Sequence, residues 1–221
     1  MQPSNTQRFV VFDVETDRLL NAARDNWTDL RVTTCVAVES LFVDHCVAQP
    51  IVVHEIVLFD DIDKDARSAA DHARFGLLMD SADAVVAYNG RGFDLRVLFN
   101  HYDAERVKRW TSRLVDPFEA IRKATNSWVK LDELLDANGL PRKAGAGVDA
   151  VEWWADGQRS RVMEYCRQDA IGLHHIICLD DIRFPIKRWT ANGEHAVECM
   201  ATLKWREYLS SCELFKKAPP I

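Results

Sequence analysis

The stretch FVVFDVETD, residues 9–17, constrains the fold most strongly, because it puts two acids on a strand that is otherwise apolar. Residues 8–14 are rich in β-branched and aromatic side chains, which is typical of a core strand. Side chains alternate along a strand, so Asp13 and Glu15 are expected to share a face. Two carboxylates in a dry place repel each other, and a divalent cation removes that penalty. The alternative is that the strand ends at Asp13 and both acids face water.

Hydrophobic patterning after this strand predicts a mixed α/β fold. Two further strands, at 31–40 and 49–60, are joined by a short polar link, so the first three strands are expected to form an antiparallel group. Apolar residues at helical spacing predict a helix over 61–83, and a short buried strand follows at 84–89. The apolar face of that helix is expected to comprise Ala66, Ala69, Ala70, Ala73, Leu77 and Leu78.

The second half of the chain has mainly helical patterns. Asp116 precedes Pro117 and lies three residues before Glu119, which is a capping pattern at a helix start. Strands followed by helices mixed with at least one further strand indicate one α/β domain with a mixed central sheet. The remaining predicted helices cover residues 93–102, 128–140, 148–155, 158–181 and 196–209.

Composition limits the class of protein. With 221 residues, of which 48% are hydrophobic, the chain is long enough for one core and richer in apolar residues than a disordered chain. No run of about 18 uncharged apolar residues occurs, so no membrane span is expected. The polar N-terminus lacks a signal-peptide pattern, which favours an intracellular, cytoplasmic protein, or a nuclear one in a eukaryotic or viral setting. The net charge of −6 argues against non-specific binding of duplex DNA, which needs a basic surface.

The six cysteines are scattered along the chain, and none forms a C-x-x-C pair. Four of them, Cys35, Cys46, Cys166 and Cys178, lie in apolar surroundings. Buried reduced thiols are therefore expected, rather than a disulfide framework or a zinc site.

Two later segments add acids to the pair on the first strand. In NGRGFDLRVL, residues 89–98, Asp94 stands at a helix start, where free backbone N–H groups favour a carboxylate, so it could simply be a cap. In the helix over 158–181, Tyr165 and Asp169 are four residues apart and lie on the apolar face. An acid on a buried face needs a partner, which could be structural.

The ordered combination of these motifs is more specific than any one of them. It comprises Asp-x-Glu on the first strand, Asn-Gly-x-x-Phe-Asp after a later strand and Tyr-x-x-x-Asp on a late helix. Over about residues 8–180 it resembles the DEDD superfamily of 3′–5′ exonucleases, which has a ribonuclease H-like fold. Tyr165 indicates the tyrosine-bearing (DEDDy) branch, because the histidine-bearing branch would have histidine where this chain has Glu164. The segment NGRGFDLRVL is similar to predicted exonucleases related to family B DNA polymerase proofreading domains.

This resemblance implies a ribonuclease H-like sheet, with antiparallel first three strands and then parallel strands, flanked by helices. It also implies phosphodiester hydrolysis with two divalent cations, Mg or Mn, which prefer oxygen ligands. Asp13 would bridge both ions, Glu15 and Asp169 would complete one site, and Asp94 would help to hold the other. Tyr165 would orient the attacking water. The positions that match the four metal-binding carboxylates are Asp13, Glu15, Asp94 and Asp169.

The implied substrate is a single-stranded or frayed 3′ end of nucleic acid, with DNA favoured, although no residue identity separates DNA from RNA. A terminal base could stack on Phe93, and Asn89 could contact the substrate or be an ordinary turn residue. Thr16 could contact the sugar and Lys143 the phosphate chain, although such residues are also common in turns and on solvated surfaces. A polymerase or helicase partner could supply processivity.

We expect a disordered N-terminus at residues 1–7, an exonuclease domain at 8–182 and a C-terminal extension at 183–221 that packs on the same domain. Two other functional hypotheses stay open. One is a catalytically silent exonuclease-fold module that binds nucleic acid or protein. The other is a paired-carboxylate glycosidase, whose chemistry requires two carboxyl groups rather than four with a tyrosine.

Overall fold

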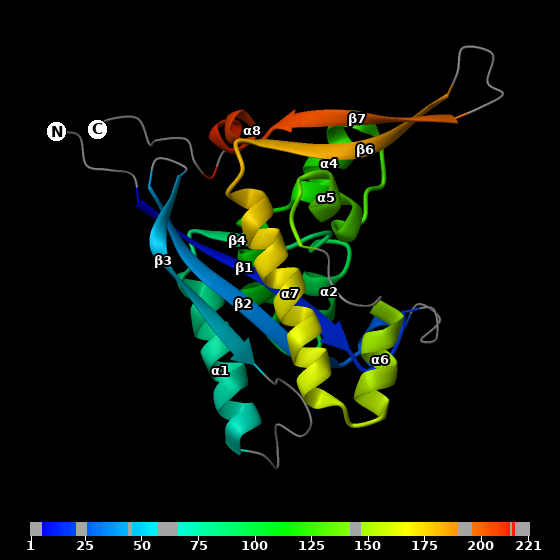
Figure 1. Ribbon diagram of the computed structural model, residues 1–221. Helices are drawn as coiled ribbons and strands as arrows, with labels where there is room; N and C mark the ends of the chain where they lie inside the picture. Colours follow the sequence, from blue (N-terminus) through cyan, green and yellow to red (C-terminus); the bar gives the residue numbers. More distant parts are fainter. Residues whose placement is uncertain are drawn as a thin grey trace.

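The computed structural model describes residues 6–20, 26–43, 46–56, 66–141, 147–189, 196–212 and 214. Within them a five-stranded sheet carries helices on both faces, and a two-stranded sheet lies beyond one end of it (Figure 1). The strands of the main sheet are β1 (Thr6–Thr16), β2 (Val32–Val43), β3 (Cys46–Ile56), β4 (Ala84–Val86) and β5 (Leu114–Val115).

The main sheet has the strand order β3-β2-β1-β4-β5. β2 is antiparallel to both β1 and β3, whereas β4 is parallel to both β1 and β5. This confirms the predicted mixed sheet, in which three antiparallel strands are followed by parallel ones. β1 begins at Thr6, which pairs with Val43, so Thr6 and Gln7 belong to the strand and the predicted disordered segment over 1–7 is wrong at these two positions.

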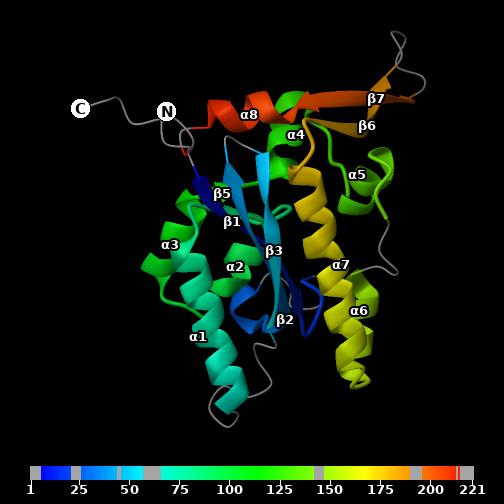
Figure 2. The ribbon, with the colours of Figure 1, turned by 60° about the vertical axis from the view of Figure 1, so that its left-hand side comes forward.

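Eight helices and one 3-10 turn, η1 (Trp27–Asp29), accompany these strands in the described part of the chain. Figure 2 shows α1 and α3 on one side of the sheet and α7 on the other. The helices are α1 (Ala66–Ser81), α2 (Asp94–Leu98), α3 (Ala104–Ser112), α4 (Pro117–Thr125), α5 (Leu131–Ala137), α6 (Gly147–Ala155), α7 (Arg159–Ile177) and α8 (Trp205–Ser211).

The alternation of side chains along β1 divides the interior into two cores. Val10, Phe12 and Val14 pack in the core that also holds residues of α1, α2 and α3. Phe9 and Val11 point the other way, into the core that also holds residues of α4, α5 and α7. The odd-numbered positions of β1 therefore face α7, because successive side chains of a strand point to opposite faces.

Helix α1 turns a different face to the sheet from the one predicted. Its predicted apolar alanines are exposed, and Leu77 is 67% exposed; of the predicted face only Leu78 is buried. Phe75 and Met79 are fully buried, and Phe75 packs edge-on against Phe12. Large side chains remove more apolar area from water than alanines do, so they decide the orientation of the helix. The predicted helix start at residue 61 lies outside the described residues.

The C-terminal region contains a hairpin that the sequence pattern did not predict. β6 (Asp181–Trp189) and β7 (Ala196–Lys204) form an antiparallel pair. The helix predicted over 196–209 is therefore wrong for residues 196–204, and α8 begins at Trp205. The segment AVECMATLK contains good helix formers, but backbone pairing with β6 overrides this weak local preference.

Trp205 links this hairpin region to the main body. Its side chain is fully buried, and its indole N–H donates to the carbonyl oxygen of Ile177 at 3.1 Å. Ile182 and Phe184 of β6 are buried in the same core as the inner face of α7. The described part of residues 183–221 therefore shares one core with the helix that ends before it.

The described helices include none that is both long and apolar enough to cross a membrane. The expectation of buried thiols is confirmed for Cys35 and Cys166, whereas Cys178, Cys199 and Cys212 are only partly buried and the side chain of Cys46 lies outside the described residues. The free cysteines are Cys35, Cys166, Cys178, Cys199 and Cys212.

Candidate functional site

Asp13 and Glu15 lie near the carboxyl end of β1, on the face that packs against α7. They continue the odd-numbered positions that carry Phe9 and Val11, and both are partly buried. The thiol of Cys166 on α7 donates to the carbonyl oxygen of Asp13 at 3.3 Å. The helix and the acidic end of the strand are therefore held in direct contact.

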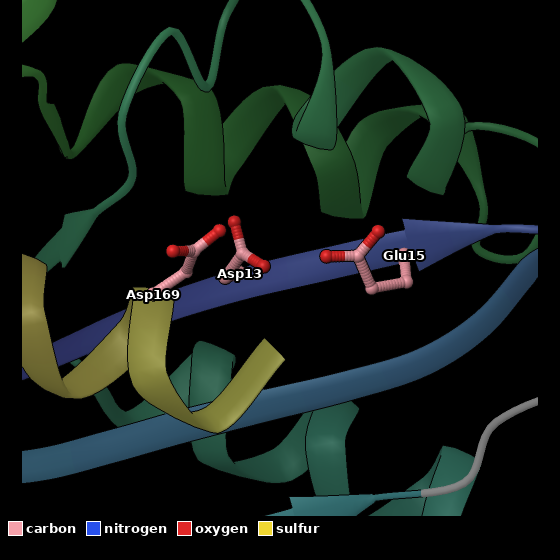
Figure 3. Close-up of side chains that lie close together, drawn as sticks. All are labelled: Asp13, Glu15 and Asp169. Atoms are coloured by element: carbon pink, nitrogen blue, oxygen red, sulfur yellow. The ribbon is translucent and has the colours of Figure 1, made fainter. Parts of the chain in front are cut away.

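Asp169 of α7 joins these two acids in a group of three carboxylates (Figure 3). It is only 5% exposed, and one oxygen from each of the three residues lies within 4.8 Å of the others. In Figure 3 the carboxylates of Asp13 and Asp169 lie next to each other, and that of Glu15 lies further along β1. Like charges at this separation disfavour full ionisation unless a cation or protons balance them.

Asp94 lies beside this group but is not one of the three carboxylates that fall within 4.8 Å of one another. It is the first residue of α2, it is 4% exposed, and its Oδ1 accepts a hydrogen bond from the backbone N–H of Val14 at 3.3 Å. Burial raises its pKa to about 7; the negative charges of Asp116 and Asp169 act in the same direction, and hydrogen bonds from backbone N–H groups oppose them. Asp94 is thus attached to the residue between Asp13 and Glu15.

The turn before α2 positions Asp94 through close packing around Asn89. Asn89 has φ +60°, a left-handed conformation that asparagine tolerates better than most residues. Its backbone N–H and that of Gly90 donate to the two carboxylate oxygens of Asp116 at 3.0 and 2.9 Å. A Cβ atom on Gly92 would lie 2.3 Å from Oδ1 of Asn89, so only glycine fits there without displacing that side chain.

Asp116 also caps α4, as the sequence predicted. Its Oδ1 accepts hydrogen bonds from the backbone N–H groups of Phe118 at 3.0 Å and Glu119 at 3.4 Å. One buried carboxylate therefore joins the turn after β4 to the start of α4. The sequence indicated the cap but gave no signal for the contact with the turn.

Tyr165 lies one helical turn before Asp169 on α7 and is 3% exposed. Its ring packs edge-on against Trp153 of α6, with centroids 5.7 Å apart and an interplanar angle of 76°. The predicted apolar stripe of α7 is confirmed, because Val162, Tyr165, Asp169, Leu173 and Ile176 are all buried. Helix α6 thus fixes the orientation of the tyrosine.

A cavity of about 810 Å³ brings most of the predicted site residues together. Its volume lies within the usual range for ligand pockets, about 300–1,000 Å³. Lys143 lies outside the described residues. The predicted site residues that line the cavity are Asp13, Glu15, Thr16, Asn89, Phe93, Asp94, Tyr165 and Asp169.

The predicted substrate residues in this cavity have local contacts of their own. The hydroxyl of Thr16 donates to the carbonyl oxygen of Arg18 at 2.9 Å, and the residue is only 6% exposed. Phe93 is half-buried and packs edge-on against Trp27 at a centroid distance of 6.1 Å. Both contacts hold the residues in place at the edge of the cavity.

The sequence pattern missed Trp128 as a residue of this cavity. The helix predicted over 128–140 begins only at Leu131, so Trp128 lies on the preceding linker and is 68% exposed. A large aromatic residue at the start of an amphipathic pattern looks like a core position. Its place in a linker depends on where the helix begins, which patterns define poorly.

The donor atoms of this site suit a particular class of metal ion. Asp13, Glu15 and Asp169 offer carboxylate oxygens only, and the group includes neither histidine nor cysteine among the described residues. Oxygen-only sets are typical of magnesium, calcium and manganese, whereas zinc sites usually contain nitrogen or sulfur ligands. The residues therefore fit a hard divalent cation.

The fold and the site together define an α/β protein with an acidic, metal-compatible pocket at the carboxyl end of its central strand. A family model described as the RNase_H superfamily, RNase_H_2, matches residues 51–179, and the chain belongs to this superfamily. The matched region contains Asp94, Tyr165 and Asp169 and begins after β1.

Other comparisons add little to this assignment. No curated protein matches the chain. A solved structure described as the yeast NOT1 MIF4G domain co-crystallised with CAF1 is similar with 17% sequence identity and a TM-score of 0.38. The similarity covers 84% of this chain and 82% of that one. A TM-score this low supports no argument about fold or function.

Proposed function

We propose that this protein is a metal-dependent 3′–5′ exonuclease that hydrolyses phosphodiester bonds at the 3′ end of single-stranded nucleic acid. The observation that carries the proposal is the group formed by Asp13, Glu15 and Asp169, whose oxygens lie within 4.8 Å of one another. These acids come from positions 13 to 169 of the chain, so only the folded protein brings them together. Membership of the RNase H superfamily supports a nuclease.

The tyrosine-bearing DEDD branch is the subclass that we propose. Tyr165 lines the same cavity as Asp169 and is held by Trp153. Asp94, the fourth acid of the motif set, also lines this cavity. A similarity to family B polymerase proofreading domains remains a hypothesis based on the segment around Asp94.

Asp13, Glu15 and Asp169 would hold divalent cations, Mg or Mn, with Asp94 contributing from the start of α2. Two such ions would supply water of lowered pKa and neutralise charge on the leaving oxygen. The chain itself positions the ligands: Cys166 holds α7 against β1, and Val14 holds the carboxylate of Asp94. Tyr165 would orient the attacking water with its hydroxyl group, because an unperturbed tyrosine, with a pKa of about 10, is a poor base at neutral pH.

The proposed substrate is a single-stranded or frayed 3′ end, with DNA favoured over RNA. Phe93 would stack on the terminal base, and Asn89 and Thr16 would contact the terminal nucleotide. Lys143 stays a predicted phosphate contact. The domain boundaries at 8–182 and 183–221 and a polymerase or helicase partner also remain predictions.

The direct test is to incubate the purified protein with a 5′-labelled single strand and Mg²⁺ or Mn²⁺. We expect a ladder that shortens from the 3′ end, that a chelator abolishes and that Asp13→Asn and Asp169→Asn each remove. Asp156→Asn is the matched control, because Asp156 is exposed in the turn between α6 and α7. Tyr165→Phe should reduce the rate while metal binding is retained.

Absence of metal-dependent shortening of both DNA and RNA would contradict the proposal. Binding of nucleic acid that survives Asp13→Asn, without hydrolysis by the wild type, would instead favour a catalytically silent module. Hydrolytic activity that survives a chelator would point to carboxyl chemistry of another class.

A further inference from the structure

Trp128 is an exposed aromatic residue on the rim of the candidate active site. It lies between α4 and α5, is 68% exposed and lines the same cavity as Asp13 and Asp169. An indole offers a large, rigid surface for contact, and bases stack on such rings whatever their sequence. Its position suggests a binding surface next to the reacting centre.

The ring of Trp128 packs against a chain of aromatic residues that are themselves held in place. It packs edge-on against Phe118 at a centroid distance of 5.3 Å, and Phe118 packs edge-on against Tyr88 at 5.6 Å. The hydroxyl of Tyr88 donates to the carbonyl oxygen of Val129 at 2.6 Å, and Val129 is only 3% exposed. The exposed ring is thus preorganised, which reduces the entropy cost of binding.

Two basic side chains lie near Trp128, one against its ring and one in the active-site cavity. The guanidinium of Arg122 lies 4.5 Å from the centroid of the indole, and the exposed Lys130 lines the active-site cavity. These two cations can attract the phosphate of a nucleotide next to the one that is cleaved.

A second cavity of about 540 Å³ begins at Trp128 and leads toward the hairpin formed by β6 and β7. Its charged lining residues are three acids and one lysine, and the lysine is paired with one of the acids at 3.8 Å. A phosphate chain is repelled by such a lining, because each phosphate adds a negative charge. These lining residues are Glu133, Asp136, Glu198 and Lys187, of which Glu133 also lines the active-site cavity.

We propose that Trp128 stacks on an unpaired base next to the terminal nucleotide. The protein does not bind tightly to nucleotides beyond this base. This inference rests on the proposed exonuclease function and specifies its substrate as very short oligonucleotides or briefly frayed 3′ ends. Binding comes mainly from stacking, and the footprint is two or three nucleotides, below the range of about 4–16 nucleotides found for single-strand-binding folds.

The test measures binding of 5′-labelled oligothymidylates by fluorescence anisotropy, with Ca²⁺ in place of Mg²⁺ so that binding is seen without turnover. The lengths run from two to about 16 nucleotides, at several salt concentrations. Trp128→Ala is compared with Trp128→Phe, which keeps an aromatic face. Leu77→Ala is the matched control, because Leu77 is 67% exposed on α1 and does not line this cavity.

We expect wild-type affinity to level off at two or three nucleotides and to depend weakly on salt. Trp128→Ala should weaken binding by roughly 5- to 150-fold, the range measured for one stacked base. Trp128→Phe should recover most of the loss, and Leu77→Ala should bind like the wild type. Equal affinity of Trp128→Ala and wild type, or affinity that keeps rising with length and falls steeply with salt, would overturn the inference.

A kinetic measurement separates this inference from the proposed function. The ratio of kcat/KM for a trinucleotide to kcat/KM for thymidine 5′-p-nitrophenyl phosphate, which has no neighbouring base, should fall in Trp128→Ala. An unchanged ratio contradicts the role of Trp128. If the wild type hydrolyses neither substrate, the exonuclease proposal fails, and the binding measurement alone decides the role of Trp128.

Discussion

Asp13→Asn tests whether the three gathered carboxylates form a site for cations, because it removes one negative charge with almost no change of shape. One oxygen from each of Asp13, Glu15 and Asp169 lies within 4.8 Å of the others. At about 5 Å and an effective dielectric constant of about 20, each pair of full charges repels by about 3 kcal/mol. Asp13 takes part in two such pairs, although water and proton uptake reduce the sum.

We therefore expect Asp13→Asn to raise the free energy of unfolding of the metal-free protein by about 1–2 kcal/mol. For a domain of this size this corresponds to an increase in Tm of roughly 2–8 °C, measured by thermal unfolding in a chelator. With Mg²⁺ or Mn²⁺ added, the wild type should have the higher Tm of the two proteins. A ligand at about 100 times its Kd stabilises the wild type by about 2.7 kcal/mol, and the variant should gain much less.

Two outcomes would refute this reasoning. One is a lower Tm for Asp13→Asn than for the wild type in the chelator, which would mean that the carboxylate is held by favourable contacts. The other is an equal metal-induced rise in Tm for both proteins. Asp156→Asn, which changes an exposed acid, should follow the wild type under both conditions.

Two further predictions concern stability. Trp205→Ala should lower the free energy of unfolding by about 3–5 kcal/mol in urea titrations, because it empties a fully buried site and leaves the carbonyl of Ile177 without its indole donor. The control Met200→Ala, at a 49% exposed position, should change the free energy of unfolding by less than about 0.5 kcal/mol. Burial lowers the pKa of His101 to about 4, and its Nε2 accepts from the backbone N–H of Val32 at 3.2 Å. The unfolded chain therefore binds the proton more readily, so stability should fall by the order of 2 kcal/mol as pH drops from about 6.5 to 4. His101→Gln, which keeps an acceptor but does not titrate, should flatten this dependence in unfolding curves measured across that range; an unchanged slope would contradict the assignment.

The parts of the fold that depend on local pattern were predictable from the sequence. Strand β1 contains a run of β-branched and aromatic residues, and the capping residue Asp116 marks the start of α4. The exposed face of α1 was not predictable, because alanine-rich spacing fits several orientations and the bulk of Phe75 decides among them. The hairpin of β6 and β7 was missed because each strand obtains its hydrogen bonds from the other.

The candidate site shows the same division between local and long-range information. The spacings that put Asp13 with Glu15, and Tyr165 with Asp169, follow from strand and helix geometry. The hydrogen bond between Val14 and Asp94 does not, because it spans 80 positions and requires β4 to lie beside β1. The shared cavity of these residues is thus a property of the tertiary structure.

The alternation along β1 has a consequence for how this protein can change. Phe9 and Val11 anchor the strand through the same set of positions that presents Asp13 and Glu15. Inserting or deleting a single residue between Val11 and Asp13 would turn the acids toward the opposite core, while a change of two residues would preserve their direction. Tolerated length variation in this strand should therefore occur in even steps, and a library of indels would reveal that parity.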